Sequence, residues 1–213
     1  MLPLNVAETK AERSFGLNYD VNYQTSFFDG NLGFSINHMF FYTRINDPLL
    51  LTELTTGNLA YQQPKGNLNT KGMETNAKVA YGDFKLFIGY TLADVNQRSE
   101  GNSSRYPLVS KHRLNNVLMY EVEDKWKIGA EAYYYGRQKL NDGATGKSYW
   151  TAGLMAEKIW ERFSIFINFE NFTNTRQTKF DTIYTGTITS PVFRDIYAPV
   201  DGFVINGGIK IVL

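Results

Sequence analysis

The sequence predicts an all-β protein built from antiparallel transmembrane strands that run up and down in a meander. Three observations support this fold class: apolar and polar residues alternate along most of the 213 residues, short and long connections alternate, and aromatic residues gather near strand ends. Aromatic residues make up 15% of the chain, but no stretch approaches the roughly 20 apolar residues that a membrane helix needs. Any crossing of a membrane must therefore be made by strands.

The composition excludes several other classes of protein. The formal net charge is +1, so no basic excess is available to bind the phosphates of DNA or RNA. Cysteine is absent, which removes disulfides, thiolate metal ligands and cysteine nucleophiles. No linker or change in composition divides the chain, so residues 1–213 are expected to form one domain. The first residues, MLPLNVAETKAER, lack the basic and apolar regions of a secretory signal peptide.

The alternation is clearest near the N-terminus, where Phe15, Leu17, Tyr19, Val21 and Tyr23 alternate with polar residues and glycine. Because successive side chains of a strand point to opposite faces, this pattern gives one apolar and one polar face. The pattern recurs at 73–81, 84–92, 126–134, 150–156, 163–169 and 203–213. The stretches 32–42 and 113–120 fit less well, because His38 and Asn116 interrupt their apolar faces. Together these stretches predict about nine strands.

The connections between the expected strands are alternately short and long. Residues 28–31, 82–83, 121–125 and 158–162 form the short turns, whereas 46–69, 94–110, 138–148 and 171–202 are long and polar. Outer-membrane barrels place tight turns on the periplasmic side and long loops outside, with aromatic belts at both interfaces. Here aromatic residues border the short turns (Tyr81, Phe84, Tyr120, Trp126, Trp160, Phe163) and the long loops (Tyr42, Tyr90, Tyr134, Trp150, Phe203). The sequence thus favours a bacterial outer-membrane barrel over a soluble sandwich.

An odd number of strands does not close a bacterial barrel, which normally has an even number. Two open edges would leave N–H and C=O groups that a bilayer cannot satisfy. We therefore expect this chain to form an open, curved antiparallel sheet, and expect a signal peptide and further strands to precede it. The end of the chain has the pattern of an assembly signal, with apolar residues at alternate positions to its last residue: Phe203, Ile205, Ile209, Ile211 and Leu213.

Several stretches resemble the closing strands of TonB-dependent receptors of Gram-negative bacteria. The resemblance rests on a Gly-x-Glu strand, a Pro-x-x-x-x-His strand entry, an Asn-x-Glu-Asn element and the entry to the last strand, which correspond to 72–74, 107–112, 168–171 and 199–203. These receptors more often end in Phe or Trp, so Leu213 departs from the usual form. The order and spacing of the motifs, rather than any one of them, make the resemblance specific.

The resemblance implies that the chain is the C-terminal part of a 22-stranded barrel. It also implies an N-terminal plug domain and the uptake of siderophores, cobalamin, glycans or similar nutrients, with energy passed from the inner membrane through TonB. The expected partners are outer-membrane lipid, the plug and the remaining strands, the TonB complex through the plug, and a small nutrient ligand. Neither the plug nor a TonB-contacting segment is recognisable in this sequence.

Candidate functional residues fall into two groups. The first is expected to face the lumen, where its members pair across strands, hold the plug or line a substrate path: Glu74, Lys78, Glu131 and Arg137. The second lies in the longest loop and is expected to contact substrate, because binding residues gather on loops that a rigid scaffold holds: Arg176, Lys179, Tyr184, Arg194 and Tyr197. Cross-strand pairing is the leading expectation for the first group.

The sequence does not favour catalysis, a cofactor or a metal site. His38 and His112 are far apart and lack the spacing of metal ligands. Ser35 and His38 suggest a hydrolase only until their geometry is considered, because residues of opposite parity on a strand point to opposite faces. The alternative to a transport receptor is a complete small barrel or β-sandwich that serves as an adhesin or structural module.

Overall fold

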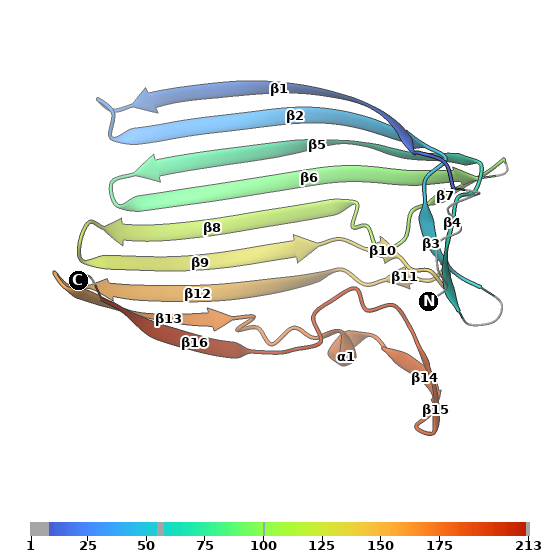
Figure 1. The fold of residues 1–213 in the computed structure, drawn as a ribbon. Helices are drawn as coiled ribbons and strands as arrows, with labels where there is room; N and C mark the ends of the chain where they lie inside the picture. The colour runs from blue at the N-terminus through green and yellow to red at the C-terminus, as the bar shows by residue number, and fades with distance from the viewer. Residues whose placement is uncertain (1–8, 55–57, 100, 212–213) are drawn as a thin grey trace.

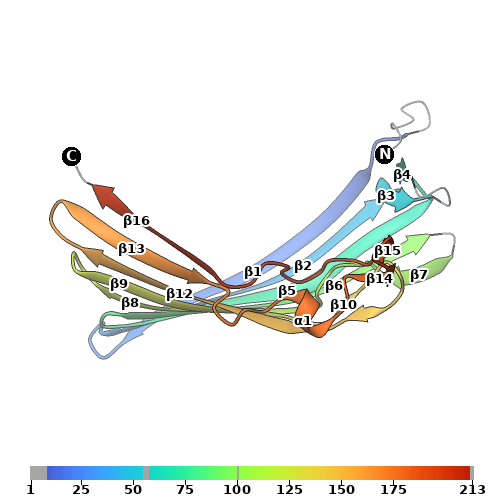
Figure 2. The ribbon, with the colours of Figure 1, turned by 90° about the horizontal axis from the view of Figure 1, so that it is seen from below.

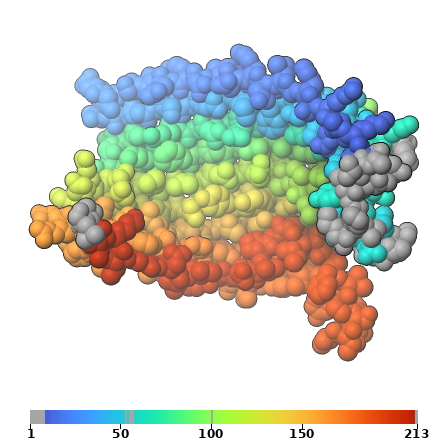
Figure 3. All heavy atoms as spheres, viewed as in Figure 1, coloured from blue at the N-terminus to red at the C-terminus, as the bar shows by residue number. Residues whose placement is uncertain are grey.

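One antiparallel sheet dominates the computed structural model, which describes residues 9–54, 58–99 and 101–211 (Figure 1). Nine strands pair in the order β1-β2-β5-β6-β8-β9-β12-β13-β16, and their atoms form successive bands of colour from blue to red across the sheet (Figure 3). Their bounds are β1 Arg13–Phe27, β2 Leu32–Asn46, β5 Gly66–Tyr81, β6 Phe84–Ser99, β8 His112–Val122, β9 Trp126–Tyr135, β12 Tyr149–Ile159, β13 Phe163–Glu170 and β16 Val204–Ile211. A short strand, β7 (Asn102–Arg105), pairs with the end of β6. The predicted all-β meander of about nine strands is confirmed.

The sheet is a single curved layer that does not close on itself (Figure 2). Among the described residues, β1 pairs only with β2 and β16 pairs only with β13. The predicted open, curved sheet is therefore confirmed. No second large sheet packs on it within the same residues, so the alternative of a β-sandwich receives no support.

The strand register brings the apolar stripes of all nine strands onto one face of the sheet. Tyr19 lies opposite Phe40, Phe40 opposite Met73, and Met73 opposite Leu92. Because side chains alternate along each strand, the polar stripes share the other face. We call the apolar side the outer face and the polar side the inner face. Large apolar side chains on the outer face are freely exposed, among them Phe15 at 65% and Ile209 at 65%.

The two residues that interrupt the apolar pattern do lie on the outer face. His38 Nδ1 is 2.7 Å from the hydroxyl oxygen of Thr75, which is its register partner on β5. Asn116 lies opposite Ile88 on one side and Ala132 on the other. The hydrogen bond to Thr75 gives the imidazole a polar partner within an apolar face, which lowers the cost of placing it there.

The first four strands of the sheet are longer than the sequence indicated. β1 and β2 have 15 residues and β5 and β6 have 16, compared with the roughly 9 to 11 that cross a bilayer. β5 begins at Gly66 and β6 continues to Ser99, so the predicted limits of the loops 46–69 and 94–110 were wrong. The outer face of these extensions is polar, so apolar alternation did not reveal them.

The predicted short turns connect the strands at one end of the sheet. The amide of Asn31 donates to the carbonyl of Phe28 at 3.1 Å, and that of Lys125 donates to Val122 at 3.0 Å. Gly82 begins the two-residue turn between β5 and β6 with a φ of +53°, a conformation that costs glycine little. Tight turns of this kind keep the neighbouring strands in register.

The long connections lie at the other end of the sheet and contain small elements of their own (Figure 1). These are the hairpins β3–β4 (Leu50–Glu53, Leu59–Gln62), β10–β11 (Gln138–Lys139, Thr145–Gly146) and β14–β15 (Tyr184–Thr187, Ser190–Phe193), and helix α1 (Gln177–Phe180). In the described part of the chain, no helix has the length and apolar character needed to span a membrane. The arrangement of short turns and long loops at opposite ends agrees with the sequence prediction.

Candidate functional site

Several hollows lie above the described strands on the inner face, two of them over different parts of the sheet. One, of about 690 Å³, lies over β9, β12 and β13, and its lining includes Glu131, Tyr133, Thr151 and Asn168. The other, of about 540 Å³, lies over the strands from β1 to β8 and is lined mainly by amides, Lys78 and a few apolar side chains. Both hollows thus combine hydrogen-bonding groups with apolar side chains, which in the first hollow include Met119 and Met155.

Three of the four predicted lumen residues lie on the inner face. Glu74 accepts a hydrogen bond of 2.7 Å from the Asn76 side chain, and Glu131 accepts one of 2.7 Å from the Tyr133 hydroxyl. The Lys78 ammonium lies 5.4 Å from the centre of the Phe87 ring. None of the three forms an ion pair with another described residue. Their part in a substrate path or in holding a plug stays a prediction.

Arg137 does not lie on a strand face, because β9 ends at Tyr135. The chain leaves the sheet at Gly136, whose amide donates to the His112 carbonyl at 2.8 Å. A Cβ at Gly136 would lie 3.0 Å from that same carbonyl oxygen, so the close approach suits glycine. The strand therefore ends two residues before Arg137, and the alternation does not extend to it. The Arg137 side chain is exposed.

Cross-strand ion pairs do form on the inner face, but near the short turns. Glu121 pairs with Lys85 at 2.7 Å and with Lys127 at 3.4 Å. Glu157 pairs with Lys210 at 2.9 Å and accepts a hydrogen bond of 2.6 Å from Ser164. The pair between Glu121 and Lys127 could have been predicted from the sequence, since the two residues lie at matching distances on either side of one turn.

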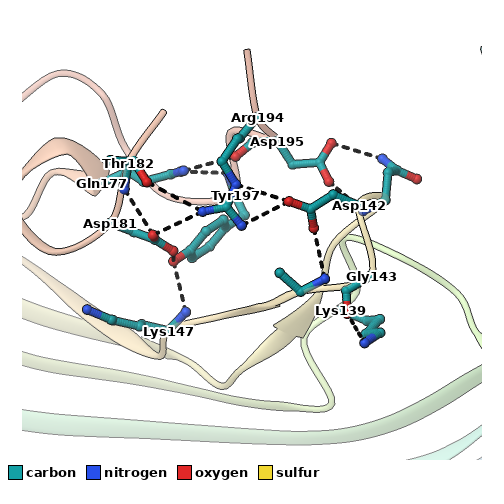
Figure 4. Close-up of polar contacts among 12 residues, drawn as sticks. Lys139, Asp142, Gly143, Lys147, Gln177, Asp181, Thr182, Arg194, Asp195 and Tyr197 are labelled. Atoms are coloured by element: carbon teal, nitrogen blue, oxygen red, sulfur yellow. Dashed lines mark hydrogen bonds and ion pairs between the residues drawn. The ribbon is translucent and has the colours of Figure 1, made fainter. Parts of the chain in front are cut away.

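At the opposite end, the segment 138–149 packs against the segment 174–199, and we call these two segments the loop cluster (Figure 4). Its apolar core consists of buried Leu140, Tyr197 and Ala198, with Tyr149 and Phe180 against them. A Cβ at Gly146 would lie 2.7 Å from the Tyr197 ring, so only glycine allows the ring to lie on this backbone. The loops are therefore fixed by packing.

The Gln177 side chain is fully buried and holds helix α1 against the backbone of 195–198, within the second segment of the loop cluster. Its Oε1 accepts from the amides of Tyr197 at 2.8 Å and Ala198 at 3.1 Å, and its Nε2 donates to the Asp195 carbonyl at 2.9 Å. Each of these backbone groups would otherwise lack a partner in a buried position. Sequence reasoning missed Gln177, because its partners are about twenty residues away.

Tyr197 and Arg194, which the sequence suggested as substrate contacts, form contacts within the loop cluster (Figure 4). The Tyr197 hydroxyl donates to Asp181 at 2.6 Å and accepts from the Lys147 amide at 2.8 Å. Burial, and then this bond to Asp181, raises the pKa of Tyr197 to about 12. The bond from Tyr197 in turn lowers the pKa of Asp181. Arg194 pairs with Asp142 at 3.0 Å and with Asp181 at 3.5 Å.

The other three predicted loop residues differ in exposure. Arg176 precedes α1, and its buried Nε has no hydrogen-bond partner among the described residues. The Lys179 ammonium donates to the Asn174 carbonyl at 2.8 Å. Tyr184 is 43% exposed on the β14–β15 hairpin, which projects away from the sheet (Figure 1). Contact of any of the five with substrate stays a prediction.

The residues of the expected assembly signal lie along the outer face of the last strand. Ile205, Ile209 and Ile211 are 55%, 65% and 69% exposed, and the Phe203 ring stacks on Phe169 with centres 6.0 Å apart. Leu213 lies outside the described residues. No group of three or more potential metal ligands occurs in the part of the chain that the structure describes.

An apolar outer face bordered by aromatic residues at both ends, and a polar inner face, define the wall of a transmembrane β-barrel. The chain belongs to the family of TonB dependent receptor-like β-barrels, whose model matches residues 9–172. The resemblance seen in the sequence is thereby confirmed. No curated protein sequence matches the chain.

Solved structures of outer-membrane receptors have the same fold. The FrpB iron transporter from Neisseria meningitidis matches 95% of this chain with a TM-score of 0.66 and 14% identity. The pyoverdine outer membrane receptor FpvA from Pseudomonas aeruginosa matches 94% with a TM-score of 0.58 and 18% identity. The ferric-catecholate import receptor Fiu from E. coli matches 76% with a TM-score of 0.53 and 18% identity. The chain spans 32%, 30% and 24% of these proteins, respectively.

Proposed function

We propose that this chain forms the C-terminal wall of an outer-membrane receptor that takes up a small nutrient with energy passed through TonB. Further strands complete the barrel from the open edges of β1 and β16, and a plug domain fills its lumen. The observation that carries the proposal is the division of the sheet into an apolar outer face and a polar inner face with hollows. The family match over residues 9–172 supports a receptor rather than an adhesin or a structural module of similar architecture.

The loop cluster gives this wall a preformed rim on the extracellular side. Its core and its ion pairs hold 138–149 against 174–199, so the rim needs little ordering when a ligand arrives. The larger inner-face hollow includes Asn171, Pro199 and Gly202 in its lining, so it reaches from the strands to this rim. A ligand entering past the loops would next meet the polar groups of that hollow, among them Glu131 and Tyr133.

Iron chelates are the first class of substrate to test. This choice follows from the names of the similar structures, which include an iron transporter, a ferric-catecholate import receptor and a pyoverdine receptor. Cobalamin and glycans are tested in the same way. In a receptor of this kind the loops and the plug determine which substrate binds, so the inner wall alone does not select among these nutrients.

Growth of a strain lacking the gene tests the proposal. The strain is supplied in turn with iron chelates, cobalamin or glycans as the limiting nutrient, and we expect a defect on one of them that the intact gene restores. Two neighbouring substitutions on β12 then separate transport from folding. Thr151→Trp places a ring in the inner-face hollow, whereas Ala152→Trp places one on the outer face.

We expect Thr151→Trp to reduce uptake severalfold and Ala152→Trp to leave it near the normal level, with equal amounts of both proteins in the outer membrane. Normal growth of the deletion strain on every nutrient would contradict the proposal. Equal uptake by the two variants would show that the inner face does not line the path.

A further inference from the structure

A cationic hollow lies on the outer face of the sheet, on the side away from the lumen. It has a volume of about 320 Å³ and lies between the extended ends of β2, β5 and β6. Three cations line it, Arg44, Lys71 and Arg98, together with Tyr42 and the amides Asn69 and Asn96. We call it the outer-face cationic hollow. The transport path does not use it, because all of these side chains point away from the inner face.

The cations of this hollow are largely uncompensated. Lys71 and Arg98 are exposed, and within the described residues neither side chain forms a hydrogen bond or an ion pair. Arg44 donates from Nε to the neutral Asn46 side chain at 3.0 Å. The acid opposite Lys71 is Asp94, which is engaged by Arg105 at 3.7 Å and by the Asn96 amide at 2.9 Å. An anion from outside the chain would therefore find free donors here.

The level of the hollow along the strands identifies the kind of anion. One row of register partners joins Phe40, Met73 and Leu92, which are all apolar. The next outer-face row toward the loops joins Leu17, Tyr42, Lys71 and Asp94, and the row beyond it joins Phe15, Arg44, Asn69 and Asn96. On β2, β5 and β6 the outer face thus changes at Tyr42, a belt residue, from apolar side chains to polar ones that include three cations. Side chains at that step lie at the depth of lipid headgroups.

The opposite end of the wall has the other sign of charge. Its short turns carry five acidic residues, Asp29, Asp83, Glu123, Asp124 and Glu161, against two basic ones, Lys125 and Arg162. Lys158 is an outer-face cation at this end, but its ammonium lies over the rings of Trp126 and Trp160. Among the described residues, the cations that gather around a hollow of the outer face lie at the loop end. Only one leaflet of a bilayer can be in contact with the hollow.

We propose that the outer-face cationic hollow binds the phosphate groups of a lipid in the outer leaflet. The three cations surround a recess wide enough for a headgroup phosphate, Tyr42 lies against the start of the acyl chains, and the asparagines donate further hydrogen bonds. Phosphate meets the requirement for a compact anion that accepts bonds from several donors at once. The inference rests on the outer-membrane placement proposed above.

Lipid retention by the complete receptor tests this inference. The receptor is extracted in a mild detergent, incubated with bisphosphorylated lipid A or with the same lipid after removal of its phosphates, and examined by native mass spectrometry. The test variant is Lys71→Gln with Arg98→Gln. The matched control, Lys125→Gln with Arg162→Gln, also removes one lysine and one arginine, but at the turn end.

We expect the control to retain phosphorylated lipid as the unaltered receptor does, and the test variant to retain at least about fivefold less. The dephosphorylated lipid should be retained weakly by all three proteins. Equal retention by the two variants, or equal retention of the two lipids, would overturn the inference. Nutrient uptake by the test variant separates this failure from a failure of the proposed function, because the hollow does not face the lumen and uptake should persist.

Discussion

The strand wall and the loop cluster are stabilised in different ways, although one chain forms both. In the wall, large apolar side chains point outward and remain exposed, as Leu17 does at 66% and Ile211 at 69%. In the loop cluster, Leu140 is 3% exposed and Gln177 is fully buried. The loop cluster has the packed core of a soluble protein, whereas the wall is one layer thick and has its apolar surface on the outside.

This difference indicates that the wall is stable in lipid and the loop cluster in water. The ladder of backbone hydrogen bonds holds the wall together, but its outer face is favourable only against lipid. The loop cluster satisfies most of its buried polar groups internally, with Arg176 Nε as an exception, and stands in water. A substitution in the wall should therefore act according to the face it is on, and one in the loop cluster according to its burial and partners.

The largest expected effect comes from a charge on the outer face of the wall. Ile88 lies on that face in the middle of the apolar stretch 84–92 of β6, so Ile88→Arg should lower the free energy of unfolding in lipid vesicles by about 2–4 kcal/mol. Asn115→Arg is the control, since Asn115 pairs with Gly89 at the same level but points to the inner face. Urea titration measures both, and equal losses would contradict the assignment of the two faces.

In the loop cluster, removal of a buried amide should open the loops without disturbing the wall. Gln177→Ala leaves the Tyr197 and Ala198 amides and the Asp195 carbonyl without partners, and should lower the free energy of local opening by about 2 kcal/mol. Hydrogen exchange of those two amides measures the change. Gln24→Ala, an exposed wall residue, should have no effect there. Unchanged protection in the first variant would show that Gln177 does not hold the cluster.

A smaller effect is expected at a short turn of the wall. Gly82→Ala forces a φ of +53° on a residue with a side chain, and should cost about 1–2 kcal/mol in the free energy of unfolding. Gly129→Ala serves as the control, because a Cβ there meets nothing closer than 3.9 Å and the φ is not positive. Equal stability of the two variants would indicate that the turn relaxes to another conformation.

The smallest effect is a dependence of the loop cluster on acid. The pKa of Asp181 is lowered, chiefly by the bond from Tyr197, so its stabilising contribution is present above the ordinary carboxyl pKa of about 4. That contribution, about 1 kcal/mol, is lost as the pH falls through the lowered pKa. Hydrogen exchange at the Tyr197 amide should show the loss, and Asp181→Asn should reduce it. If the Asp181→Asn variant lost protection at low pH as the unaltered protein does, a group other than Asp181 would be responsible for the effect.

Much of the wall was predictable from the sequence, because the features that define its strands and turns involve residues that are close together along the chain. Alternation from Phe15 to Tyr23 fixes which side chains share a face, and Gly82 marks a turn without reference to any distant residue. The ends of the strands were less predictable. Beyond Tyr42 the outer-face positions become polar, as at Arg44, Asn69 and Asn96, so the apolar stripe ends while the backbone pairing continues.

The loop cluster was not predictable, because its contacts join residues that are far apart along the chain. Tyr197 lies on Gly146, about fifty positions away, and no local pattern relates the two. From the sequence, Tyr197 and Arg194 were selected because they are polar residues in a long loop. Their sequence positions do not distinguish a side chain that binds a ligand from one that stabilises the loop. Gln177 was missed for the same reason, because its hydrogen-bond partners are about twenty residues away along the chain.

The central claim is that the two faces of the wall meet lipid and water, respectively. Spin labels attached at successive positions of β9 in the complete receptor, through Ile128→Cys, Gly129→Cys, Ala130→Cys and Glu131→Cys, test it most directly. Residues 128 and 130 should be accessible to oxygen dissolved in lipid, and 129 and 131 to a water-soluble nickel chelate, so that the two accessibilities alternate with a period of two residues. Similar access of the nickel chelate to all four positions would contradict the claim.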